Sequence, residues 1–208
     1  MIWVRNFAAW KHSSLQLFPF YLCFIVGAET VGWILDLKSE FALAANFFKY
    51  LVIPVEYCFL LFLFYREWVH WKYRYVVLLF ISLYLVSFMA ETYLGWTRHL
   101  RFFSLSYTLG NLFLLITVLA FLLRLGSGKG ILFIRHNPLF WMSCGMLVFY
   151  IGSFPFYGLY LFLGKTNLIL FYRYQFIVTL LNCFMYTLFL IAGLWGKPKY
   201  ISSFSSLH

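Results

Sequence analysis

The sequence predicts an all-α integral membrane protein, a six-transmembrane-helix bundle, and three observations lead to this fold class. The chain of 208 residues is 64% hydrophobic and only 11% charged, with a mean hydropathy of +0.86. Its apolar residues gather in long unbroken runs, and short polar segments separate the runs. Charged residues make up about a quarter of a soluble domain, so a water-soluble fold is excluded.

Each apolar run is long enough for one membrane crossing. A helix rises 1.5 Å per residue, so about 20 residues cross a hydrocarbon core of about 30 Å. Backbone polar groups in lipid need internal partners, and runs without alternating polar residues favour helices over barrel strands. In chain order, the expected helices are approximately 15–35, 44–65, 75–94, 102–123, 139–163 and 168–194.

The first run is as long as a full span and follows an amphipathic segment, so we expect it to remain in the mature protein. Short loops between the spans predict antiparallel neighbours in one compact bundle. We therefore divide the chain into an amphipathic cytoplasmic segment (1–14), a six-helix transmembrane domain (15–195) and a flexible cytoplasmic tail (196–208).

The positions of Lys and Arg predict the orientation, because positive residues near helix ends are retained in the cytoplasm. Ten of the 16 Lys and Arg residues lie on the side of the amino terminus. Both termini are therefore predicted to be cytoplasmic. The formal net charge of +10 is explained by this topology, and no nucleic-acid partner is expected.

Three glutamates, Glu29, Glu56 and Glu91, lie inside apolar runs. A carboxylate at this depth costs ~2.5–3.5 kcal/mol or more, so such residues are candidates for function. Two cations, Lys49 and Arg173, are within spans or near their ends. Glu56 lies deepest of the three acids, and we expect it to be the most sensitive to protons.

Polar residues recur on one face of most spans, at separations of three, four and seven. These series are Asn46, Lys49 and Glu56; Tyr84, Ser87 and Glu91; Ser104, Thr108 and Asn111; Tyr150, Ser153 and Tyr157; and Gln175, Thr179, Asn182 and Tyr186. We expect these faces to turn inward and to form a polar cavity that opens to the outside. Pro155, inside the fifth span, is expected to kink the helix and act as a hinge.

The candidate ligand-binding or ion-pairing residues are Glu29, Lys49, Glu56, Glu91, Asn111, Arg173, Gln175 and Asn182. A purely structural interpretation stays open beside the functional one. Neutral polar side chains also hold membrane helices together, at ~0.6 kcal/mol each. The acids would then form ion pairs that only fix the register of the helices.

No catalytic motif, cofactor or metal is expected. The four cysteines lie within spans without CxxC spacing, and the five histidines fall in loops or at the ends. Zinc requires such ligands in clusters. The sequence also contains no HExxH helix and no pair of aspartates placed for hydrolysis within the membrane.

Residues 137–156 (NPLFWMSCGMLVFYIGSFPF) and 175–195 (QFIVTLLNCFMYTLFLIAGLW) resemble a group of bacterial multi-span membrane proteins. These occur alone or as the membrane-embedded input regions of some sensor histidine kinases. The residues that carry the resemblance are Phe140, Trp141, Gly145, Pro155 and Asn182, with Glu29 and Glu56. About a third of the chain matches well, and the rest matches only in topology.

The resemblance implies a sensor-like protein, but this chain stops 13 residues after residue 195, so signalling would require a separate cytoplasmic protein. We therefore expect a receptor-like subunit that lies in the lipid bilayer and binds a small or lipid-like ligand. Two alternatives stay open: a small-molecule or proton/cation-coupled transporter or channel subunit, and a membrane effector that acts as a homo-oligomer.

Overall fold

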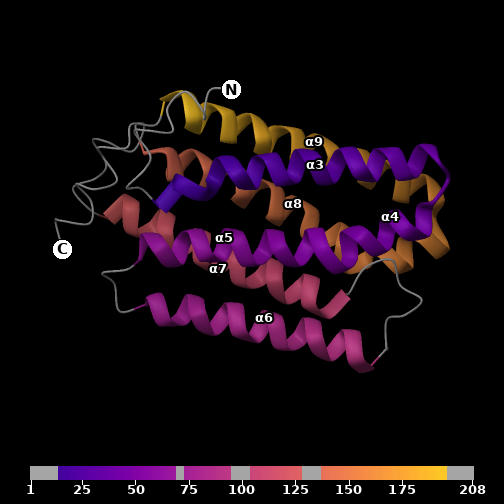
Figure 1. Ribbon diagram of the computed structural model, residues 1–208, viewed down its shortest axis with the longest axis horizontal. Helices are drawn as coiled ribbons and strands as arrows, with labels where there is room; N and C mark the ends of the chain where they lie inside the picture. Colours follow the sequence, from indigo (N-terminus) through magenta and orange to yellow (C-terminus); the bar gives the residue numbers. More distant parts are fainter. Residues whose placement is uncertain (1–13, 69–72, 95–103, 128–136, 196–208) are drawn as a thin grey trace. The chain divides into compact units, whose positions relative to one another are not determined.

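The computed structural model describes residues 14–68, 73–94, 104–127 and 137–195, and these residues form helices joined by short turns, with no strand among them (Figure 1). Six helical segments are long and apolar enough to cross a membrane, so the prediction of six membrane-length helices is confirmed. They are Leu15–Leu37, Phe41–Glu67, Arg74–Tyr93, Leu105–Gly126, Pro138–Phe156 and Leu168–Leu194.

The described chain divides into two compact units, and the boundary falls inside one helix, between Leu114 and Leu115. Unit 2 consists of Ser14–Leu114, and the described part of unit 1 begins at Leu115. Residues 1–13 and 196–208 lie outside the described residues. Nearly all of the expected cytoplasmic segment and the whole expected tail are therefore outside the described structure.

Unit 2 starts with a short 3-10 helix, η1 (Ser14–Leu17), which leads into α3 (Phe18–Leu37). The turn after α3 places Ser39 at a φ of 59°. The Glu40 N–H donates to the Leu35 carbonyl, and the Ser39 N–H donates to the Asp36 carbonyl, each at 3.0 Å. These two bonds form a Schellman motif, which ends the first span and returns the chain toward the second.

The second span consists of three segments: α4 (Phe41–Phe47), a π-helical turn η2 (Phe48–Val52) and α5 (Ile53–Glu67). Pro54 explains the π turn, because it has no N–H to continue the α-helical series. The N–H of Ile53 instead donates to the Phe48 carbonyl, five residues back. A π turn contains one residue more than an α-helical turn, so α4 is rotated about the helix axis relative to α5. Residues of α4 and α5 that would share a face of a regular helix therefore point in different directions.

The core of unit 2 is formed by α5 against its neighbours. Helix α6 (Arg74–Leu94) packs along α5, as Figure 1 shows. Helix α7 (Ser104–Ser127) contributes its first three turns to this unit. The buried face of α5 contains Tyr57, Leu60, Leu61, Leu63 and Phe64.

Unit 1 contains the hairpin of α8 (Pro138–Thr166) and α9 (Leu168–Trp195). An asparagine caps each helix: the Asn137 Oδ1 accepts from the Leu139 N–H, and the Asn167 Oδ1 accepts from the Leu170 N–H, each at 3.0 Å. Such caps satisfy backbone donors that have no partner within the helix. The two helices approach closely at Gly145, where a Cβ would lie 3.2 Å from the Met185 carbonyl oxygen.

Candidate functional site

Polar and charged side chains of three membrane-length helical segments, Phe41–Glu67, Arg74–Tyr93 and Leu105–Gly126, lie near one another. We call this group the polar cluster and define it as Lys49, Glu56, Tyr57, Tyr84, Glu91 and Asn111. Lys49 comes from η2, Glu56 and Tyr57 from α5, Tyr84 and Glu91 from α6, and Asn111 from α7. The cluster thus combines four of the eight candidate residues with two tyrosines.

A hydrogen bond between α5 and α7 lies at the centre of the polar cluster. The Tyr57 hydroxyl donates to the Asn111 Oδ1. Both side chains are buried, with 2% of Tyr57 and none of Asn111 exposed. The Asn111 Nδ2 has no hydrogen-bond partner among the described residues. Asn111 was predicted to turn inward, and the structure confirms its burial.

Aromatic rings surround this hydrogen bond. The ring centroid of Tyr57 lies 5.3 Å from that of Tyr84 and 5.6 Å from that of Tyr107. Gly110 allows the rings to come this close to α7, because a Cβ there would lie 3.0 Å from Tyr84 and 3.1 Å from Tyr57. The spacing of the rings is within the 4.5–7 Å that is typical of favourable aromatic pairs.

Glu91 holds the first turn of α7. Its Oε1 accepts from the Leu105 N–H at 2.9 Å, and its Oε2 accepts from the Ser106 N–H at 2.8 Å. The first N–H groups of a helix have no partner inside the helix and carry a partial positive charge, which makes them good donors to an anion. Glu91 is 6% exposed. Its carboxylate therefore exchanges water for two backbone donors, and it fixes α7 against α6.

Lys49 is buried in the same region, with 3% of its surface exposed. Lys49, on η2, lies within electrostatic range of the Glu91 carboxylate. The Nζ also lies 5.5 Å from the centroid of the Tyr50 ring. An opposite charge reduces the cost of holding either ion away from water. Lys49 was expected to bind or pair with an acid, and the structure places it near Glu91.

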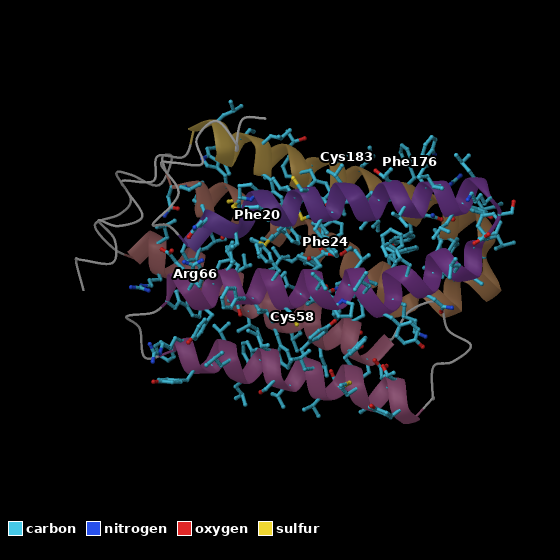
Figure 2. The ribbon with its side chains drawn as sticks, in the orientation of Figure 1. Phe20, Phe24, Cys58, Arg66, Phe176 and Cys183 are labelled. Atoms are coloured by element: carbon cyan, nitrogen blue, oxygen red, sulfur yellow. The ribbon has the colours of Figure 1, made fainter. Side chains whose placement is uncertain are left out.

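Glu56 is half-buried, and the charges of Glu56 and Glu91 both act on the Tyr84 hydroxyl. Cys58 lies two residues further along α5, where Figure 2 shows its position. Tyr84 is 1% exposed.

The structure corrects the expected inward face of the second span. Asn46 is exposed, and Tyr57 rather than Glu56 occupies the fully buried position on α5. The π turn is the reason, because its extra residue changes the rotation between Asn46 and Glu56. The series on α6 is buried as predicted, since Tyr84, Ser87 and Glu91 all face inward.

The other candidate residues are not part of the polar cluster. Glu29 is exposed on α3. On α9, in unit 1, Arg173 and Gln175 are exposed and Asn182 is half-buried. The prediction that the whole series on α9 turns inward is wrong, because α9 packs on α8 through the neighbouring face. That face contains Val178, Met185, Leu188, Phe189 and Ala192.

The α8 helix continues through Pro155, the expected hinge. Two serines of this helix, Ser143 and Ser153, are fully buried, and their hydroxyl oxygens have no partner among the described residues. All five histidines lie outside the described residues. In the described part of the chain, no group of three His, Cys, Asp or Glu side chains is placed to hold a metal ion.

Sequence reasoning missed Tyr57 as a cluster residue. Two features of the sequence point to it. Pro54 in the middle of an apolar run indicates a change of helical rotation just before Tyr57, and Gly110 beside Asn111 indicates a large group that packs against α7. Neither feature predicts that Tyr57 bonds to Asn111, because this pairing depends on how the helices pack.

The arrangement provides a buried cation, two acids, a hydroxyl and an amide on three membrane-length helical segments that pack together. Such a group can bind a small polar molecule, an ion or a proton. Comparison of the chain with family models, with curated proteins and with solved structures finds no match.

Proposed function

We propose that this chain is a receptor-like subunit of a bacterial inner membrane, which binds a small or lipid-like ligand at the polar cluster. The observation that carries the proposal is the convergence of Lys49, Glu91, Tyr57 and Asn111 from three membrane-length segments. Placing a polar group inside a membrane costs free energy, so several polar groups close together are typical of a binding site. Both termini are cytoplasmic in this proposal.

Helix α7 supplies the means of transmission. Its first turn is held by Glu91, its next turns contain Tyr107 and Asn111, and its last turn ends at Ser127. A ligand that changes the bond between Tyr57 and Asn111 would shift α7 along or about its axis. Packed helices respond to such shifts by small rigid-body movements. A separate cytoplasmic protein that contacts the far end of α7 would receive the change.

Co-purification tests the proposal. We would purify the wild type, Glu56→Gln and Tyr57→Phe in detergent and identify retained small molecules by mass spectrometry. We expect the wild type to retain a molecule that both variants lose in large part. Glu29→Gln is the matched control, because Glu29 is an exposed acid outside the polar cluster, and it should retain the wild-type amount.

Two results would overturn the proposal: no molecule retained by the wild type, or equal retention in all four proteins. Each preparation should first show one symmetric peak in size-exclusion chromatography and a helical circular-dichroism spectrum. A variant that passes these checks and loses the molecule has lost binding and not folding.

A further inference from the structure

The Asn111 side chain presents a buried donor that the described protein does not satisfy. None of its surface is exposed, its Oδ1 accepts from the Tyr57 hydroxyl, and its Nδ2 has no hydrogen-bond partner among the described residues. Buried amide groups are nearly always hydrogen-bonded, because they lose their bonds to water on burial. The Nδ2 group therefore requires an acceptor.

Nearby protein groups are engaged in other bonds. Both oxygens of Glu91 accept from the first turn of α7. The Ser87 hydroxyl donates to the Tyr84 carbonyl at 2.7 Å, and the Tyr57 hydroxyl donates to the Asn111 Oδ1. The backbone around Asn111 lies inside α7, where carbonyl groups take part in the helix.

We propose that the ligand of the polar cluster is an uncharged molecule with a carbonyl, ether or hydroxyl oxygen, which accepts a hydrogen bond from the Asn111 Nδ2. This inference rests on the proposed function and specifies the chemical class of the ligand. The remainder of the molecule is apolar or aromatic, because the tyrosine that donates to Asn111 packs its ring against those of Tyr84 and Tyr107.

The charges of the cluster explain why the ligand is neutral. The Glu91 carboxylate has two backbone donors and lies in the field of Lys49. An anion beside Asn111 would be repelled by the two acids of the cluster, and a cation would lose its water at a place where Tyr57, Tyr84 and Asn111 are at most 2% exposed. A neutral oxygen costs far less to bury, and one amide N–H is enough to compensate for it.

The test compares Asn111→Leu with the wild type in the co-purification experiment. Leu has nearly the shape of Asn but donates no hydrogen bond. We expect Asn111→Leu to retain about tenfold less of the molecule, as the loss of one buried hydrogen bond predicts. Asn182→Leu is the matched control, since Asn182 is a half-buried asparagine on α9, and it should retain the wild-type amount. The molecule should be neutral at pH 7 and contain an acceptor oxygen.

The outcomes separate the inference from the proposed function. If the wild type retains nothing, both are wrong. If Tyr57→Phe loses the molecule but Asn111→Leu keeps it, only the inference is wrong. The same holds if the retained molecule is an ion. In both cases water is the acceptor for the Asn111 Nδ2. If Asn111→Leu does not fold, Asn111→Ser replaces it. The serine hydroxyl is too short to reach the same acceptor, so the same loss is expected.

Discussion

Glu91 explains how a carboxylate is tolerated in a membrane-length helix. Its oxygens accept from the Leu105 and Ser106 N–H groups at 2.9 and 2.8 Å. The same bonds satisfy two donors at the start of α7, which would otherwise be buried without a partner. A single side chain therefore removes the cost of three buried polar groups.

We predict that Glu91→Gln lowers the free energy of unfolding by about 2 kcal/mol, because hydrogen bonds to a charged acceptor contribute about 1.5–3 kcal/mol. The glutamine Oε1 can accept from one N–H, but its Nε2 would face the other. Reversible unfolding of the protein in detergent micelles, followed by circular dichroism, measures the change.

Glu29→Gln is the control for this prediction. Glu29 belongs to an AET sequence like that of Glu91 (residues 28–30 and 90–92), but it is exposed. Its replacement should leave the free energy of unfolding unchanged or raise it. Equal losses for the two variants would show that the bonds to α7 contribute nothing to stability.

At the scale of the helices, hydropathy predicted the existence of the six spans but not their faces. A run of apolar residues determines where a helix crosses the membrane, because transfer free energy depends on composition and length. The π turn at Phe48–Val52 rotates α4 relative to α5 without changing the composition or the length of the run. The inward position of Tyr57 and the outward position of Asn46 could therefore not be predicted from a regular helical period.

The hairpin of α8 and α9 depends on a close approach at Gly145. A Cβ at this position would lie 3.2 Å from the Met185 carbonyl oxygen and 3.4 Å from the Met185 Cα. Backbone atoms cannot move independently, as the end of a flexible side chain can. An alanine Cβ at residue 145 would therefore push α8 and α9 apart. We predict that Gly145→Ala lowers the free energy of unfolding by about 1–3 kcal/mol, as overpacking does.

Gly27→Ala is the matched control, because a Cβ at Gly27 on α3 has no atom within 4 Å. Alanine is favoured over glycine inside a helix by roughly 0.5–1 kcal/mol. Gly27→Ala should therefore not lower the free energy of unfolding in the same micelle assay. If Gly145→Ala were equally harmless, the close approach at Met185 would not contribute to the hairpin.

At the scale of the whole molecule, the sequence predicted a helical membrane protein and four of the six residues of the polar cluster. Lys49, Glu56, Glu91 and Asn111 were candidates because charge and amide groups are rare in apolar runs. The burial of Gln175 and Asn182 could not be predicted. It depends on which face of α9 packs on α8, and both faces contain apolar residues.

The distribution of Lys and Arg predicts the orientation of the whole chain, and cysteine labelling measures it. The four native cysteines lie within the helices and would be replaced by serine or alanine. Ser39→Cys then tests the exposed turn after α3, and Gly126→Cys tests the exposed end of α7.

We expect a membrane-impermeant maleimide to label Ser39→Cys in intact spheroplasts and Gly126→Cys only after permeabilisation, because cationic loops stay in the cytoplasm. Labelling of both variants after permeabilisation is the control for reactivity. The reverse pattern would place both termini outside. The end of α6 that holds Glu91 would then lie on the cytoplasmic side, and a ligand from outside could not reach the polar cluster in the proposed way.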